Sequence, residues 1–172
     1  PNFDSIISSQ GDVNFGNYDG VALKVEAQGS ITGGDITING SNHTLTGSDP
    51  DIPLLTQGPG LVLKAGVDQL QNTPNISNQT VGGTSFTSGG QSSSANITVG
   101  NINTAVGGEG GSVTLSTTGN ITTGNIRTGG DKPDITTVPG FVDLQATGNI
   151  EVKTINTSGS DGGDVNIIAG GL

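Results

Sequence analysis

The sequence is poor in several residue types on which common protein classes depend. It contains no Cys, no Met and no Trp, and its aromatic residues are four Phe and one Tyr. Without Cys, the chain has neither a disulfide scaffold nor a thiolate metal site. Because no run of about 18 apolar residues occurs, no helical membrane span is expected. The abundance of Gly and the scarcity of strong helix formers argue against a helical bundle.

Charge is also scarce and one-sided. Charged residues make up 12% of the chain, well below the roughly 25% of an ordinary domain. The 15 acidic residues outnumber the 5 basic ones, which gives a net charge of −10. Without a basic run there is no surface for a phosphate backbone, so no nucleic acid partner is expected. About half of the 172 residues are Gly, Asn, Thr or Ser, a composition that disordered chains share.

The apolar residues, however, recur in a regular pattern. One motif is a pair of apolar residues five positions apart, usually with Asn or Gly between them. Its copies are Ile31/Ile36, Ile97/Ile102, Ile121/Ile126 and Ile150/Ile155. A second motif precedes it and reads apolar-x-apolar-x-small-x-Gly, as at 113–119 and 142–148. Repeats of about 20 to 30 residues made of strand-like pieces are typical of β-solenoids.

The repeats predict an all-β solenoid of about six coils with three short strands in each coil. Stacking of the coils would place Val113 next to Val142, and Ile121 next to both Ile97 and Ile150. The glycines at the predicted corners are expected where the backbone takes a positive φ. These glycines are Gly119, Gly124 and Gly148. Asn96, Asn120 and Asn149 are expected to form a ladder beside the Ile core.

The whole chain, 1–172, reads as a single solenoid segment without a second domain or a linker. Insertions that interrupt the repeats are expected near 41–60, 66–94 and 129–140, as loops at the corners. The incomplete coils at 2–9 and 164–172 would expose unpaired strand edges. They predict that copies associate end to end into a filament.

Residues that could carry chemistry are few and dispersed. His43 is the single histidine, and no second histidine or cysteine is present to share a metal with it. The acid pairs Asp49/Asp51 and Asp131/Asp134, the latter with Lys132, lie in insertions rich in Gly and Pro. Acids in such a context are usually turn residues. We therefore predict no catalytic, cofactor-binding or metal-binding residues, and a chain that is not an enzyme.

Two Gly-rich strings come near to the calcium-binding pattern of β-rolls. In GGEGGSVTL, at 107–115, Ser112 stands where the pattern has Asp. In GSDGGDVNI, at 159–167, Asp164 is present but the apolar residue comes one position early. A β-roll calcium array is therefore disfavoured, while a single calcium site in a loop stays open.

Five segments of the sequence, at 11–31, 60–66, 93–104, 110–130 and 148–167, share a pattern of repeats. In these segments the chain resembles the filamentous-haemagglutinin-like exoproteins of two-partner secretion systems, in the form common in cyanobacteria. The resemblance implies a right-handed parallel β-helix that is secreted across the outer membrane. It also implies a role in adhesion, aggregation or a surface layer, and no catalytic residues. Since the family's secretion domain and signal peptide are not present, we expect an internal segment of such a protein.

Two classes of function remain open from the sequence. The first is a non-enzymatic structural or adhesive protein, secreted or on the cell surface, whose Thr, Ser and Asn faces and insertions contact glycans or cell surfaces. The second is a carbohydrate-binding or carbohydrate-active protein of the lyase or hydrolase type on the same scaffold. An enzyme needs several acids and bases on one face of a coil, whereas the acids here are dispersed. The sequence therefore favours the first class. A passive spacer that displays a distant domain would have the same sequence features and stays open as well.

Overall fold

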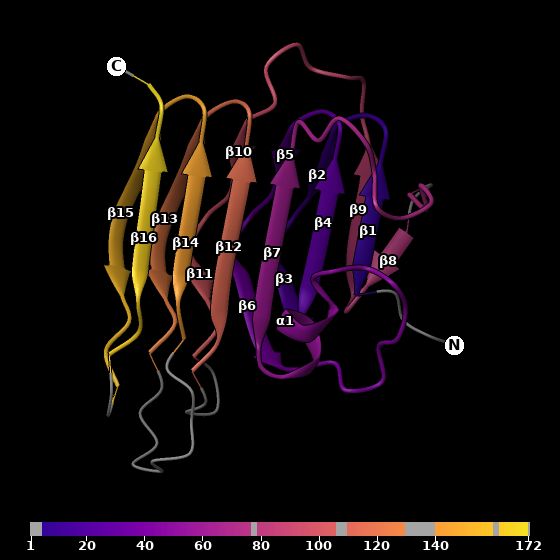
Figure 1. The fold of residues 1–172 in the computed structure, drawn as a ribbon. Coiled ribbons are helices and arrows are strands. Elements are labelled where there is room, and N and C mark those ends of the chain that lie inside the picture. The colour runs from indigo at the N-terminus through magenta and orange to yellow at the C-terminus, as the bar shows by residue number, and fades with distance from the viewer. Residues whose placement is uncertain (1–4, 77–78, 106–109, 130–139, 160–161, 172) are drawn as a thin grey trace.

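The computed structural model shows an all-β fold, and the part of the chain that it describes contains one short helix, α1 (Ile52–Thr56). The strands form a six-stranded parallel sheet and a ten-stranded mixed sheet, which face each other across a thin core (Figure 1). The all-β class predicted from the repeats is confirmed. The structure describes residues 5–76, 79–105, 110–129, 140–159 and 162–171.

The six-stranded sheet takes one strand from each successive repeat, and all of its neighbours are parallel. In sheet order its strands are β1 (Ile6–Ser9), β4 (Leu23–Ala27), β7 (Gly60–Ala65), β12 (Ser112–Thr117), β14 (Val142–Ala146) and β16 (Val165–Ala169). Val113 pairs with Val142, and Val142 pairs in turn with Val165. The register predicted from the repeat spacing is thus confirmed for this sheet.

The ten-stranded sheet contains the paired Ile residues of the other motif. Its strands are β2 (Val13–Phe15), β3 (Tyr18–Val21), β5 (Ile31–Thr32), β6 (Ile36–Gly40), β8 (Gln79–Val81), β9 (Thr84–Ser88), β10 (Ile97–Thr98), β11 (Ile102–Asn103), β13 (Ile121–Arg127) and β15 (Ile150–Asn156). Ile121 pairs with Ile97 on one side and with Ile150 on the other, as the spacing predicts.

The predicted right-handed parallel β-helix with three strands in each coil is wrong. In the later repeats the two short strands merge into one long strand, β13 or β15, and β13 joins β10 and β11 into a single sheet. The large sheet is also mixed, because β9 pairs antiparallel with both β2 and β8. The sequence periodicity reports which residues stack, but it does not report whether the chain bends between two strands.

The antiparallel pair β8–β9 arises from a tight turn inside an insertion. Gly82 and Gly83 connect the two strands and have φ values of 57° and 78°. Two consecutive positive φ values are typical of the two-residue hairpin turn that Gly-Gly favours. The expected insertion at 66–94 therefore contains a hairpin, and the one at 41–60 contains α1. Of the third expected insertion, 129–140, residues 130–139 lie outside the described part of the chain.

Asparagine ladders run along the corners between strands. The Asn96 Oδ1 atom accepts a hydrogen bond from the Asn120 N–H at 2.9 Å, and Asn120 Oδ1 accepts one from the Asn149 N–H at 2.7 Å. The predicted ladder is confirmed, with side chains bonded to the backbone of the next repeat. It also explains Gly148, where a Cβ atom would collide with Asn120 Oδ1. The positive φ expected at Gly119, Gly124 and Gly148 does not occur, and close approach is the reason for Gly there.

Aromatic side chains fill the core at the end near the N-terminus. Phe86 is fully buried, with its ring centroid 4.8 Å from that of Phe15 and 6.2 Å from that of Tyr18. The Tyr18 hydroxyl donates to the Val21 carbonyl oxygen at 2.7 Å. Burial, together with the nearby carboxylate of Asp19, raises the pKa of Tyr18 to about 12. The remaining core consists of aliphatic ladders, which suit the narrow space between the sheets.

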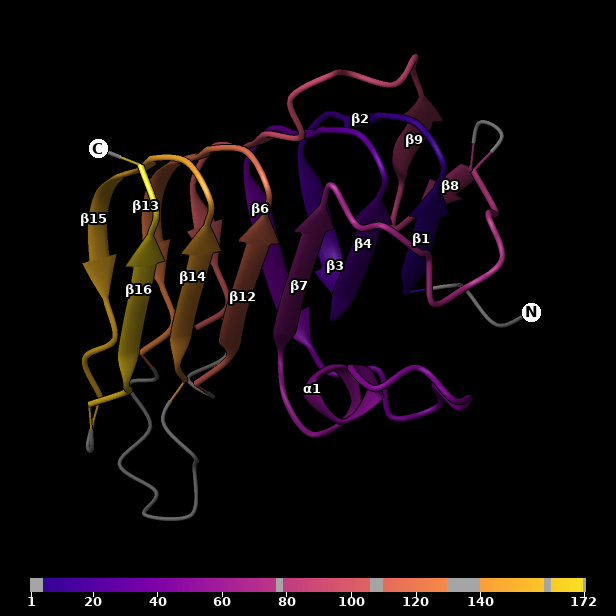
Figure 2. The same ribbon diagram turned by 45° about the horizontal axis from the view of Figure 1, so that its top comes forward.

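The insertion at 66–94 covers the strand edge nearest the N-terminus. Strand β9 pairs with β2, so that β8 and β9 lie beside the first repeat (Figure 2). Asn75 serves as a partner for β1: its N–H donates to the Ser8 carbonyl at 3.1 Å, and its Oδ1 accepts from the Ser8 N–H at 2.9 Å. Thr84 Oγ1 donates to the Asn17 carbonyl at 2.6 Å. The prediction of an open strand edge at 2–9 is therefore wrong for the described residues of that segment, because the 66–94 insertion of the same chain covers this edge.

Truncation of Leu115 to Ala should lower the free energy of unfolding by about 2–5 kcal/mol. Leu115 is fully buried between Leu63 and Leu144 in the ladder. The matched control is Ile167→Ala, in the same ladder but 49% exposed, which should cost about 1 kcal/mol. Urea unfolding of both variants measures the difference. Equal losses would show that the ladder is not the main source of stability.

Candidate functional site

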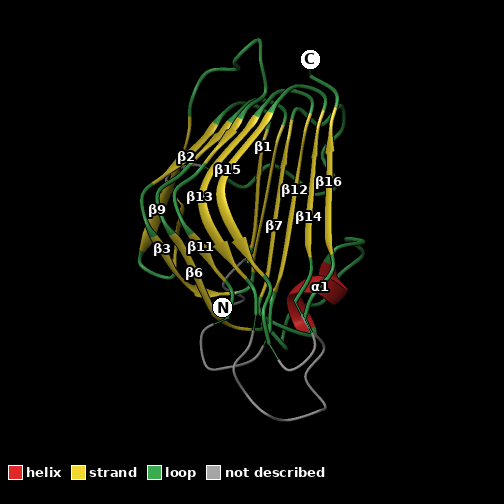
Figure 3. Ribbon diagram, turned by 90° about the vertical axis from the view of Figure 1, so that its left-hand side faces the viewer, coloured by secondary structure: helices red, strands yellow, loops and turns green. Residues whose placement is uncertain are grey.

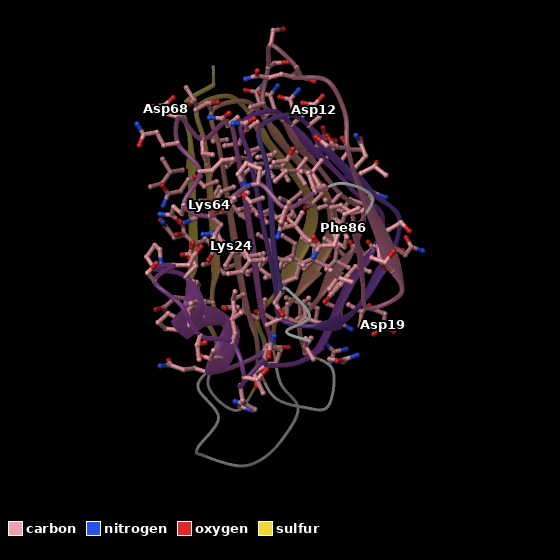
Figure 4. The ribbon with its side chains drawn as sticks, turned by 90° about the vertical axis from the view of Figure 1, so that its right-hand side faces the viewer. Asp12, Asp19, Lys24, Lys64, Asp68 and Phe86 are labelled. Atoms are coloured by element: carbon pink, nitrogen blue, oxygen red, sulfur yellow. The ribbon has the colours of Figure 1, made fainter. Side chains whose placement is uncertain are left out.

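A cluster of charged side chains lies on the outer side of the six-stranded sheet. It begins at Lys24 and Glu26 of β4, which alternate with the core residues Leu23, Val25 and Ala27. All five residues of this strand are buried, because the insertions cover the face that would otherwise meet solvent. Figure 4 shows Lys24 and the neighbouring Lys64 side by side on this flank, above α1.

Lys24 is the centre of the cluster and is fully buried. Its Nζ atom donates to Asp49 Oδ2 at 2.8 Å, to Asp51 Oδ2 at 2.7 Å and to Gln71 Oε1 at 2.7 Å. Lys64 of β7 also donates to Asp51 Oδ2 at 2.7 Å. A buried ammonium group is tolerated when it is paired with acids and when its hydrogen bonds are made. The two lysines thus attach the 41–60 insertion to the sheet.

Glu26 binds the second insertion in the same way. Its carboxylate accepts hydrogen bonds from the backbone N–H of Gln71 at 3.2 Å and of Asn72 at 2.9 Å, and from Ser8 Oγ at 2.8 Å. The Asn72 side chain joins the two halves of the cluster, since its Nδ2 atom donates to Glu26 at 3.1 Å and to Asp49 at 2.6 Å. Both insertions are therefore held by one polar network on the outside of the sheet.

The surroundings of Asp49 and Asp51 keep both carboxylates ionised. Burial opposes ionisation of Asp49, but hydrogen bonds from Lys24 and Asn72 outweigh it and lower the pKa of this carboxyl below its usual value. Burial likewise opposes ionisation of Asp51, and hydrogen bonds from Lys24 and Lys64 lower its pKa. The two aspartates are thus charged at neutral pH, and each carboxylate is compensated by a neighbouring lysine.

This arrangement suits structural support better than catalysis. A general acid or base must reach a substrate atom within hydrogen-bond distance. Lys24 and Glu26 are 0% and 1% exposed, and both side chains form their hydrogen bonds with other groups of the protein. Three hollows found in the described residues are lined by other side chains. Lys24 and Glu26, at the centre of the cluster, therefore do not meet solvent or a substrate in the surroundings that the structure describes.

The candidate residues of the sequence analysis do not come together in one site. Asp49 and Asp51, interpreted as turn residues, take part in the buried cluster. His43 is exposed and 2.8 Å from Ser41 Oγ through its Nε2 atom, apart from the cluster's hydrogen bonds. Asp131, Lys132 and Asp134 lie outside the described residues.

Sequence reasoning missed Lys24 and Glu26. A signal was available, since two opposite charges alternate with apolar residues in the string LKVEA at 23–27. That alternation equally describes a strand with one solvated face. Burial of the polar face depends on insertions that lie about 25 and 46 residues further along the chain. No local pattern could therefore have shown that these charges are buried.

Metal binding finds no further support in the part of the chain that the structure describes. No group of three or more His, Asp or Glu side chains there is arranged to hold a metal ion. Of the two calcium-like strings, residues 107–109 and 160–161 lie outside the described residues. No helix of the described chain is both long and apolar enough to cross a membrane.

The three hollows differ in chemistry. One of about 140 Å³ lies beside α1 and is lined mainly by apolar groups, among them Pro53, Leu54 and Phe141. A second of about 440 Å³ is lined by polar groups: Gln28, Asp68, Gln91, Ser92, Ser93 and Thr118. A third of about 360 Å³ opens between β15 and β16 at the end of the stack. The second hollow carries one titratable group, Asp68, and the third carries Lys153.

Replacement of Lys24 by Met should destabilise the protein by about 3–5 kcal/mol, because buried carboxylates lose their compensating charge. The matched control is Lys64→Met. The Lys64 side chain is 26% exposed, and its partner Asp51 keeps Lys24 in the control. That control should cost below about 1 kcal/mol. Chemical unfolding at neutral pH separates the two, and a mild effect of Lys24→Met would refute a central role for this residue.

Acid should weaken the attachment of the insertions. A carboxyl whose pKa is lowered by folding contributes stability above its unfolded pKa, and this stability is lost as the pH falls through the folded pKa. The stability that Asp49 and Asp51 contribute is therefore lost at pH values below 3.8, the ordinary pKa of an aspartate side chain. The free energy of unfolding, measured with urea from neutral pH down to about pH 2, should fall less steeply in an Asp49→Asn/Asp51→Asn variant. An unchanged slope in that variant would contradict the assignment.

Comparison with known proteins adds no relative to these observations. No protein-family profile, no curated protein and no solved structure matches the chain. The resemblance to filamentous-haemagglutinin-like exoproteins therefore stays a prediction from the repeat strings. Any functional conclusion depends on the sheets, the buried cluster and the hollows themselves.

Proposed function

We propose that the chain is a non-enzymatic structural part of a secreted or cell-surface protein, in which stacked parallel strands form a rigid body. The observation that carries this proposal is that the charged cluster is used within the fold. Lys24, Asp49 and Asp51, which come together most closely among the described acids and bases, are buried and are hydrogen-bonded to one another. Their chemistry is used to hold two insertions on a sheet.

The surface of the ten-stranded sheet supports the same conclusion. Its outward positions carry Thr, Asn and similar residues, as in Thr98 and Thr122, which pair side by side, and Asn103. Such side chains tolerate a solvated β surface without forming a reactive site. The resemblance of the repeat strings to secreted adhesion proteins adds support for a location outside the cell. Neither observation requires a cofactor.

Binding of carbohydrate is the second candidate, and the polar hollow of about 440 Å³ favours it. Its lining of amides and hydroxyls, with the carboxylate of Asp68, can donate to and accept from the hydroxyl groups of a sugar. Asp68 is the single titratable side chain in that lining. Glycoside hydrolysis usually requires a pair of carboxylates. The hollow therefore suits binding better than cleavage.

Polysaccharide assays test both candidates together. The chain is incubated with neutral and acidic polysaccharides, and both retention and the release of reducing ends are measured. We expect no release of reducing ends. Retention that is lost in Gln91→Ala and Asp68→Ala but kept in His43→Ala, a change at an exposed residue elsewhere, would assign carbohydrate binding to the hollow. Release of reducing ends that vanishes in Asp68→Ala would overturn the non-enzymatic assignment.

A further inference from the structure

The buried cluster holds an amine in contact with a carboxyl group. Lys24 Nζ lies 3.0 Å from Asp49 Oδ1 and 2.8 Å from Asp49 Oδ2. The two side chains are 0% and 1% exposed. Asp49 belongs to the 41–60 insertion, which contains α1, and Figure 3 shows α1 on the outer flank of the six-stranded sheet. Two groups that can form an amide are thus held together away from water.

Hydrogen-bond donors are directed at both oxygens of the Asp49 carboxyl group. The Asp51 backbone N–H donates to Oδ1 at 2.8 Å, and Asn72 Nδ2 donates to Oδ2 at 2.6 Å. When an amine attacks a carboxyl carbon, negative charge develops on a carboxyl oxygen, and fixed donors stabilise that charge. The same arrangement acts as the oxyanion hole in acyl transfer. The cluster therefore supports Asp49 as an electrophile while it holds the amine beside it.

A further carboxylate lies where it can accept a proton from the lysine. An ammonium group must lose a proton before its nitrogen has a lone pair for attack. Glu26 Oε2 lies 3.9 Å from Lys24 Nζ, and Asp51 Oδ2 lies 2.7 Å from it. Asp51 is already paired with a second lysine, Lys64, whereas Glu26 accepts hydrogen bonds from neutral donors such as Ser8 Oγ. Glu26 is therefore the better base for this step.

The charges of the cluster also favour an amide over the ion pair. Each buried ion loses its hydration, and a neutral amide in place of two ions avoids that cost. After the amide forms, Asp51 keeps its contact with Lys64. Glu26 keeps the backbone N–H donors of Gln71 and Asn72. The product therefore leaves both remaining carboxylates with partners.

We propose that Lys24 and Asp49 condense into an amide that links β4 covalently to the 41–60 insertion. Glu26 takes one proton from the Lys24 ammonium group, and the freed lone pair of Nζ attacks Asp49 Cγ. The Nζ–Cγ bond forms and one Cγ–O bond breaks. The leaving oxygen receives the proton held by Glu26 and a second proton from the nitrogen, and it departs as water. The step needs no oxidant, reductant or further reactant.

The link is a single reaction of the chain with itself, so it turns over no substrate. Exclusion of water from the site protects the amide against hydrolysis once it has formed. The ion-paired cluster is the state before the reaction, and in the linked chain Asp51 and Glu26 carry the remaining titratable charge. This inference depends on the cluster alone and is independent of the proposed function.

The intact mass of the unfolded chain tests whether the link forms. We expect the purified wild-type chain to be lighter than its sequence by one water, and the Lys24→Met and Asp49→Ala chains to have their full sequence masses. Lys64→Met is the matched control, because it removes the other lysine that contacts Asp51 and should still lose one water. A wild-type chain of full sequence mass overturns the proposal, and so does a loss of water that persists in Asp49→Ala.

Proteolysis of the unfolded wild-type chain locates the link without any variant. Trypsin should cut after Lys64 but not after Lys24, whose side chain is then an amide rather than an ammonium group. Further digestion with a glutamate-specific protease cuts after Glu26 and should leave the segments 1–26 and 27–64 joined to each other. Recovery of the two segments as separate peptides, or a missing water confined to one of them, contradicts the link.

Glu26→Gln tests the proton acceptor. Gln keeps an oxygen that accepts hydrogen bonds, but it cannot take up the lysine proton. We expect linking to be at least about 100-fold slower than in the wild type, followed as intact mass against time after cell-free synthesis. Ser8→Ala is the control, because it removes a hydrogen bond to Glu26 but keeps the carboxylate, and it should slow linking only slightly. Equal rates in Glu26→Gln and the wild type would exclude Glu26 as the base.

Discussion

Backbone hydrogen bonding between successive repeats is the constraint on which this structure depends. Each strand in the middle of the stack satisfies its N–H and C=O groups with the repeat before and the repeat after, so a missing neighbour leaves a row of unpaired groups. Such an edge has to be protected, for example by another part of the chain that covers it. The same pairing sets the register, and the register brings like apolar residues into ladders between the two sheets.

The insertions meet this requirement at the edge near the N-terminus. The hairpin β8–β9 supplies an antiparallel partner for β2, and Asn75 supplies a donor and an acceptor for β1. The charged cluster then holds the covering segments in place, since Glu26 binds the backbone of Gln71 and Asn72. The polar network therefore helps to keep this strand edge covered. It stabilises the fold by holding the insertions on the sheet.

The charges of the buried cluster are thus used in structure, and most of the exposed large apolar side chains of the described residues lie on β16. Buried acids compensate Lys24, while Val165, Ile167 and Ile168, three of the four exposed large apolar residues in the described part of the chain, belong to β16. The fourth, Val21, belongs to β3.

The sequence by itself determined the all-β class, the stacking of like residues and the asparagine ladder, because these depend on spacings within about 30 residues. Ile97, Ile121 and Ile150 pair as their spacing predicts. Only the tertiary structure decided that two strands merge at 121–127, that the 66–94 insertion folds back on β1 and β2, and that Lys24 and Glu26 are buried. These outcomes depend on contacts between segments up to 80 residues apart, such as that of Ser92 with Asp12. A local pattern does not specify such contacts, because the same alternation of polar and apolar residues fits a solvated face and a covered one.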